Sequence, residues 1–159
     1  GLLAQFAIHL RFSPVPITGQ TLGVVLAGAA LGWRRASLSM ALYVVAGLAG
    51  VPWFANHTSG YVNANFGYLL GFIAAGTIVG SLAARSGRSL IRSFFTMVIG
   101  DLVIFGFGVT WLALALHVSL ATALHLGFTP FLFGDAIKVV LASLILPATW
   151  SLVDRAERR

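Results

Sequence analysis

Charged residues are scarce in this chain. Only 9% of its 159 residues are Asp, Glu, Lys or Arg, whereas soluble globular domains carry about 25%. Hydrophobic residues make up 58% of the chain, and its mean hydropathy is +0.95. So apolar a composition excludes an ordinary soluble fold, and the chain contains several apolar runs long enough to cross a bilayer as helices. The sequence therefore predicts an all-α integral membrane protein.

Residue patterns that usually carry catalysis or metal binding are also missing. The chain has no cysteine, which excludes a disulfide framework and a thiolate metal site. Its histidines, His9, His57, His117 and His125, form no HxxxH or HExxH pair, so nothing in their spacing supports a metal site. No glycine-rich ATP-binding loop, dinucleotide fingerprint or recognisable Ser/His/Asp set occurs. We therefore expect no enzyme activity and no resident cofactor.

Positive charge follows a pattern that is typical of membrane proteins. Ten Lys and Arg against four Asp and Glu give a net charge of +6. Most of the arginines lie in three clusters between or after apolar segments: Arg34-Arg35, Arg85/Arg88/Arg92 and Arg155/Arg158/Arg159. The positive-inside rule places such clusters in the cytoplasm, so the charge indicates topology rather than a nucleic-acid partner. We expect both termini in the cytoplasm and the segments 11–16, 55–65 and 119–130 on the outer side.

The apolar runs predict six membrane-spanning helices in a single domain, residues 1–159. The expected helices are Gly1–Phe12, Ile17–Leu31, Ala36–Phe54, Phe66–Ala84, Phe94–Val118 and Phe131–Leu152. The first two are short, and we expect the first to lack part of its amino end. Pro14 and Pro16 predict an extended loop before the second helix, because proline cannot donate a backbone hydrogen bond. GxxxG pairs predict close helix packing: Gly19/Gly23, Gly28/Gly32, Gly67/Gly71 and Gly76/Gly80.

Charged residues inside a membrane segment are costly and indicate function. Asp135 and Lys138 share one face of the last expected helix, near its outward end. Two interpretations stay open: the pair satisfies only itself, or it faces a cavity in which Lys138 meets an anionic group and Asp135 accepts N–H donors. For Asp101, on the cytoplasmic side, we expect a structural pairing with Arg92 or Arg85, the alternative being a gating or coupling role.

The outward segments carry uncharged polar and aromatic side chains. They are Thr18, Gln20, Trp53, Asn56, Tyr61, Asn63, Asn65 and Tyr68. Amides beside aromatic rings suit a small ligand with one polar and one apolar face. For Trp53 and Tyr61 the alternative is anchoring at the membrane interface.

Four motifs occur in order along the chain. They are FSPVPITGQTL at 12–22, GLAGVPWF at 47–54, GYLLGF at 67–72 and PFLFGDAIK at 130–138. Together they closely resemble the BioY family, which supplies the biotin-specific substrate-binding (S) subunit of energy-coupling factor (ECF) transporters. The resemblance implies a six-helix S-component bundle in the bacterial inner membrane. It also implies capture of biotin from outside and release inside by reorientation, with a transmembrane coupling (T) subunit and two ATPases as partners.

The resemblance also implies binding residues. Asp135 and Lys138 match the family's Gly-Asp-x-x-Lys motif. We expect Lys138 to bind the carboxylate of biotin, and Asp135 to accept a ureido N–H or to orient Lys138. The other expected binding residues are Thr18, Gln20, Asn65 and Tyr68. The chain departs from the family's Pro-Thr-Gly-Gly-Tyr run, since it has Ala-Asn-Phe-Gly-Tyr at 64–68.

Two other classes of function remain as alternatives. A stand-alone secondary transporter or facilitator for a small organic acid would use Asp101 and Asp135 as proton-coupling carboxylates, but we find no inverted repeat of the kind that many such transporters contain. A structural membrane-assembly subunit would need Asp135 and Lys138 only for each other.

Overall fold

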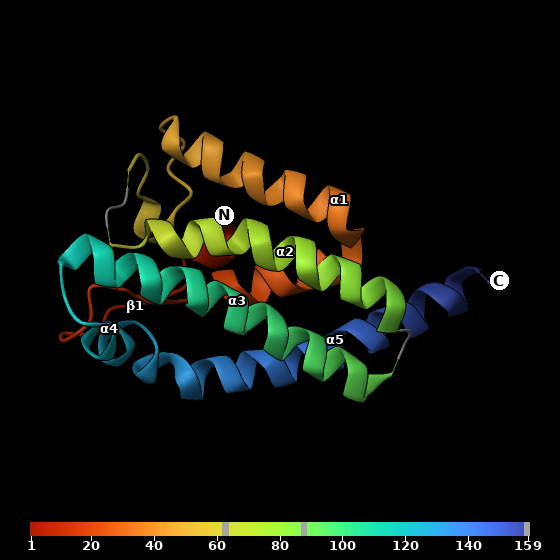
Figure 1. The fold of residues 1–159 in the computed structure, drawn as a ribbon. Coiled ribbons are helices and arrows are strands. Elements are labelled where there is room, and N and C mark those ends of the chain that lie inside the picture. The colour runs from red at the N-terminus through yellow and green to blue at the C-terminus, as the bar shows by residue number, and fades with distance from the viewer. Residues whose placement is uncertain (62–63, 87–88, 158–159) are drawn as a thin grey trace.

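The structure, a computed structural model, describes residues 1–61, 64–86 and 89–157, with the side chains of 85–86 and 146–157 left out. The elements in chain order are η1 (Leu2–Ala4), β1 (Ala7–Ile8), β2 (Ile17–Thr18), α1 (Gln20–Leu48), η2 (Ala55–His57), α2 (Phe66–Ser86), α3 (Leu90–Leu116), α4 (Leu120–Gly127), η3 (Thr129–Phe131) and α5 (Leu132–Glu157). Helix α2 packs against both α1 and α3, and α5 covers α3 and part of α1 (Figure 1).

Helix α1 contains two of the expected helices. They meet at Gly32, whose φ of 74° and ψ of 166° are not helical, a conformation that glycine adopts at little cost. The chain turns back there, because Gln20 Nε2 lies 2.7 Å from the hydroxyl of Tyr43, whereas a straight helix would separate these positions by about 34 Å. The expected separate helices over 17–31 and 36–54 are thus two arms joined at one residue.

The expected first helix, Gly1–Phe12, is wrong. This segment forms the 3-10 turn η1 and the strand β1, which pairs antiparallel with β2 so that Ala7 faces Thr18 and Ile8 faces Ile17. The N–H of Gly19 also donates to the carbonyl oxygens of Leu3 and Phe6. Backbone groups that a helix would satisfy within itself are satisfied here by pairing with the returning chain.

Glycines allow the helices to approach closely, as the GxxxG pairs predict. A Cβ at Gly71 of α2 would lie 3.0 Å from the backbone of Ile104 in α3. A Cβ at Gly80 would lie 2.5 Å from the backbone nitrogen of Trp33 in α1. Helix α2 therefore uses different glycines against its two neighbours.

The outer surface of the bundle is apolar. Exposed side chains include Leu38, Leu42, Phe95, Leu102 and Leu114, which is what hydrocarbon contact requires. In the described part of the chain, the stretches Phe66–Ala84, Leu90–Leu116 and Leu120–Ile145 are long and apolar enough to cross a membrane. The protein is a multi-pass membrane protein, but the expectation of six separate spanning helices and of cytoplasmic termini is not confirmed.

Candidate functional site

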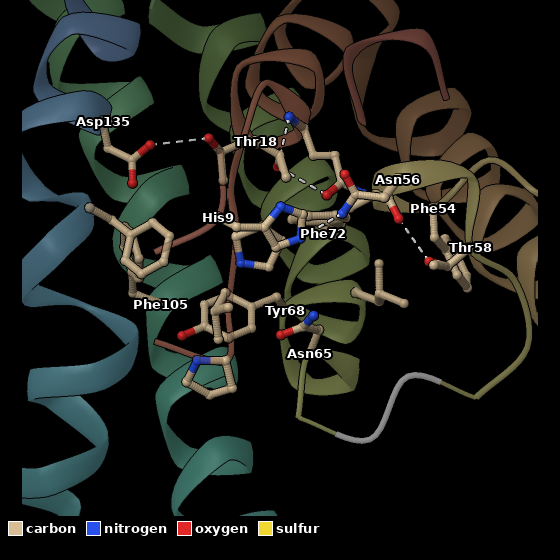
Figure 2. A pocket seen from close by; sticks show the side chains of 18 of the residues that line it. His9, Thr18, Phe54, Asn56, Thr58, Asn65, Tyr68, Phe72, Phe105 and Asp135 are labelled. Carbon is tan, nitrogen blue, oxygen red and sulfur yellow. Dashed lines mark hydrogen bonds between the residues drawn. The ribbon is translucent and has the colours of Figure 1, made fainter. Parts of the chain in front are cut away.

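A cavity of about 260 Å³ lies between the amino-terminal segment, the loop after α1 and the ends of α1, α2 and α5 (Figure 2). Apolar side chains form much of its wall, including Leu69 and Phe72 from α2, Phe105 from α3 and Phe131 from η3. A few polar groups interrupt this wall at its two ends. Such a combination is typical of a site for one small molecule.

Three polar side chains meet at the α5 end of the cavity. Lys138 Nζ lies 2.5 Å from Asp135 Oδ1 and 3.1 Å from Thr21 Oγ1. The Thr21 hydroxyl in turn donates to Asp135 Oδ1 at 3.3 Å. Asp135 and Lys138 lie on one face of α5 because they are three residues apart, and the start of α1 brings Thr21 to them. The positive charge of Lys138 is therefore balanced within the protein.

One carboxylate oxygen of this cluster lacks a hydrogen-bond partner in the described part of the chain. Asp135 is 5% exposed, and its Oδ2 atom has no hydrogen-bond partner among the described residues. A buried carboxylate oxygen without a partner is costly. Because Asp135 lines the cavity, this oxygen can accept a hydrogen bond from an N–H or O–H group of a molecule bound there.

A hydrogen-bonded chain fixes the polar groups beside this cluster. The Thr18 hydroxyl donates to Gln20 Oε1 at 3.0 Å, and Gln20 Nε2 donates to the hydroxyl of Tyr43 at 2.7 Å. Tyr43 donates onward to the carbonyl oxygen of Trp53, and the two rings stack at 5.5 Å. The orientation of Gln20 at the cavity wall is thus set by the protein.

Tyr68 and Asn65 reach the cavity from the start of α2. The Tyr68 hydroxyl donates to the carbonyl oxygen of Gly127 at 2.7 Å, so Tyr68 offers the cavity its ring. Asn65 Oδ1 is buried and has no hydrogen-bond partner among the described residues. This oxygen is a second acceptor to which a bound molecule could donate a hydrogen bond.

The opposite end of the cavity is formed by two loops. His9, after β1, lies 2.9 Å from Asn56 of η2, measured from Nε2 to Nδ2. Gln5 joins the same two segments, because its Nε2 donates to the carbonyl oxygen of Phe54 and its Oε1 accepts from the N–H of His57. His9 and Asn56, which line the cavity and are exposed, form its mouth.

The structure brings all six residues that the sequence singles out for binding to this one cavity. They are Thr18, Gln20, Asn65, Tyr68, Asp135 and Lys138. Their contacts with a ligand stay predictions. Sequence reasoning missed Thr21 and gave His9 no binding role; the only signal for Thr21 was its hydroxyl inside the motif at 12–22.

Other candidates lie away from the cavity. Asp101 of α3 is buried but does not line it. Its expected pairing with Arg92 or Arg85 stays a prediction, and the side chain of Arg85 is outside the described part. Asn63 is also outside the described residues. Trp53 stacks on Tyr43, and Tyr61 is 62% exposed; anchoring of either side chain at the membrane interface stays a prediction. Among the described residues, no group of three or more His, Cys, Asp or Glu could hold a metal ion.

Comparisons with known proteins find relatives along most of the chain. The biotin transporter BioY of Thermotoga maritima is 36% identical over 141 residues, which cover 87% of this chain and 82% of that protein. The biotin transporter BioY2 of Lactococcus lactis subsp. cremoris is 34% identical over 146 residues, which cover 90% and 79%. The BioY of Rhizobium etli is 34% identical over 149 residues, which cover 87% and 79%.

A solved structure shares the fold. The S-component for biotin from an ECF-type ABC transporter matches with a TM-score of 0.84 at 23% sequence identity, covering 94% of this chain and 84% of that one. The S-component type of fold that the motifs implied is therefore confirmed. The family model for the BioY family matches residues 1–155. The chain belongs to the BioY family.

Proposed function

We propose that this protein is the biotin-binding S subunit of an ECF transporter in the bacterial inner membrane. The relatives named above support the ligand, and the fold supports the type of subunit. The observation in this chain that carries the proposal is the buried, unpartnered Oδ2 of Asp135, held beside Lys138 and Thr21 in a largely apolar cavity.

The charges at the α5 end favour one orientation of biotin. Biotin has a fused ureido ring with two N–H donors and a carbonyl, and a valerate tail that ends in a carboxylate. Because Lys138 already neutralises Asp135, a ligand carboxylate buried at this end would gain little net attraction for a large desolvation cost. A neutral ureido ring fits better, with one N–H donated to Asp135 Oδ2.

This orientation revises the expectation that Lys138 binds the carboxylate. The rings of Phe72, Phe105 and Phe131 contact the apolar part of the fused ring system, where burial of apolar surface supplies affinity. The tail extends toward the mouth at His9 and Asn56, where its charge can stay partly hydrated.

Transport requires partners that supply energy. The chain has no ATP-binding loop, so we propose that a T subunit and two ATPases drive the reorientation that releases biotin into the cytoplasm. Uptake of biotin by this chain alone, in vesicles without the ATPases, would favour the stand-alone transporter instead.

Calorimetry on the detergent-purified chain tests the ligand. Biotin is expected to bind, desthiobiotin to bind because it keeps the cyclic urea, and thiamine not to bind. Asp135→Asn should weaken biotin binding by about 10- to 100-fold, since a hydrogen bond to a charged group contributes about 1.5–3 kcal/mol.

Asp101→Asn is the matched control, because it removes a buried carboxylate that does not line the cavity. We expect this variant to bind biotin within about threefold of the original chain, well below the effect of losing a charged hydrogen bond. A folded sample without biotin binding would overturn the proposed ligand.

A further inference from the structure

The two loops at the mouth bring a histidine and an amide into contact. His9 Nε2 and Asn56 Nδ2 are 2.9 Å apart, and both residues line the cavity (Figure 2). The position of Asn56 is set by its backbone, whose φ of 58° is left-handed, a conformation that asparagine tolerates better than most residues. Gln5 holds the neighbouring backbone of Phe54 and His57 to the amino-terminal segment. The contact is therefore built into the mouth.

His9 is the side chain at the mouth that lines the cavity and can change its charge. Lys138 is the other cavity-lining side chain that can be positive, and Asp135 neutralises it. In the described part of the chain, the remaining titratable lining residue is Tyr68 of α2, and the lining residues from α1 and α3 are uncharged. Near the mouth, Arg11 follows His9 on its own segment and His57 follows Asn56. Since His9 is exposed, protons reach it freely.

Protonation changes what this pair can bind. With a neutral imidazole, Nε2 can accept the hydrogen bond of the Asn56 amide. With an imidazolium, Nε2 becomes a donor that faces a second donor, and an anionic oxygen placed at both groups satisfies the two together. A neutral ligand end gains no such charge-assisted bond.

We propose that His9 and Asn56 form the recognition site for the anionic end of the ligand and that His9 takes up a proton when the carboxylate binds. This rests on the proposed function, which places the carboxylate at the mouth. A carboxylate is ionised throughout the range in which histidine titrates. Its charge favours the protonated imidazole, so binding is tighter at lower pH.

The first test compares biotin with biotinamide, which lacks the negative charge. Because the ligand carboxylate favours the protonated imidazole, biotin affinity is expected to fall about tenfold between about pH 5.5 and about pH 8.5, whereas biotinamide affinity stays constant. Calorimetry in buffers with different ionisation enthalpies should show proton uptake for biotin alone. Equal biotin affinity at both pH values, without proton uptake, would overturn the inference.

Variants separate the mouth from the rest of the site. His9→Gln should bind biotin with an affinity that no longer depends on pH. The matched control His125→Gln should keep the pH dependence, because His125 is exposed on α4 and is not a lining residue. Asn56→Asp keeps a residue that tolerates a left-handed backbone and should weaken biotin more than biotinamide. Retention of full pH dependence in His9→Gln would contradict the inference while leaving biotin binding intact. Absence of biotin binding in every folded variant would instead contradict the proposed function.

Discussion

Tyr68 contributes its ring, rather than its hydroxyl proton, to the cavity. The hydroxyl donates to the carbonyl of Gly127 at 2.7 Å, in a buried position. Replacing Tyr68 by Phe leaves this carbonyl without its donor, which costs about 1–3 kcal/mol. We therefore expect Tyr68→Phe to lower the free energy of unfolding by that amount in detergent, while biotin affinity in calorimetry changes little.

Tyr61→Phe provides the comparison for this prediction. Tyr61 is 62% exposed, and surface substitutions usually change stability by less than about 0.5 kcal/mol. If Tyr68→Phe instead lost most of its biotin affinity at unchanged stability, its hydroxyl would have to contact the ligand directly.

Contacts in the site could be predicted where the two residues are close in sequence, but not where they are far apart. Asp135 and Lys138 could be paired from sequence because the helix repeat places residues three apart on one face. Thr21 could not, because its hydrogen bonds to them reach across 114 and 117 positions. The bond from Tyr68 to Gly127 spans 59 positions. Such contacts depend on helix packing, which one sequence does not encode in any local pattern.

Helices α1 and α2 meet backbone to backbone at the turn of α1. A Cβ on Gly80 would lie 2.5 Å from the nitrogen of Trp33 and 2.7 Å from the carbonyl carbon of Gly32. Neither neighbour is the end of a flexible side chain, so the helices would have to separate. We expect Gly80→Ala to lower the free energy of unfolding by about 1–3 kcal/mol, as overpacking does in well-packed cores.

Gly106→Ala is the matched control in α3. A Cβ there meets nothing within 4 Å, and alanine favours a helix over glycine by about 1 kcal/mol. Stability should be unchanged or slightly raised. Equal effects of the two substitutions in denaturant unfolding would contradict close packing at Gly80.

The helices themselves were predictable to different degrees. Apolar runs predicted α2, α3 and α5 because each helix is built on an apolar stretch long enough to cross a bilayer. Residues 1–12 are apolar as well, but they pair with the chain that returns after Pro14 and Pro16, and composition does not distinguish these states. The two expected helices are joined by the non-helical backbone of Gly32. A glycine can adopt this conformation but can equally be helical, so the sequence did not predict it.

The whole bundle has two chemically different ends. The turn of α1, the end of α2, the start of α3 and the end of α5 lie together at one end, and the loops around the cavity lie at the other (Figure 1). Arg34 and Arg35 follow the turn of α1, and Arg92 lies near the start of α3. The positive-inside rule predicts that the arginine end faces the cytoplasm. We therefore expect the cavity to open to the outside, where the proposed importer would meet its substrate.

This orientation can be measured directly because the chain contains no cysteine. Two exposed serines mark the two ends of the bundle: Ser59 lies beside the cavity mouth and Ser89 lies at the start of α3. Single Ser59→Cys and Ser89→Cys variants therefore differ mainly in the end of the bundle at which the thiol lies. In intact cells, a membrane-impermeant maleimide should label Ser59→Cys and leave Ser89→Cys unlabelled until the membrane is opened. Labelling of Ser89→Cys alone in intact cells would place the cavity mouth in the cytoplasm, and capture of biotin from outside would then require the opposite topology.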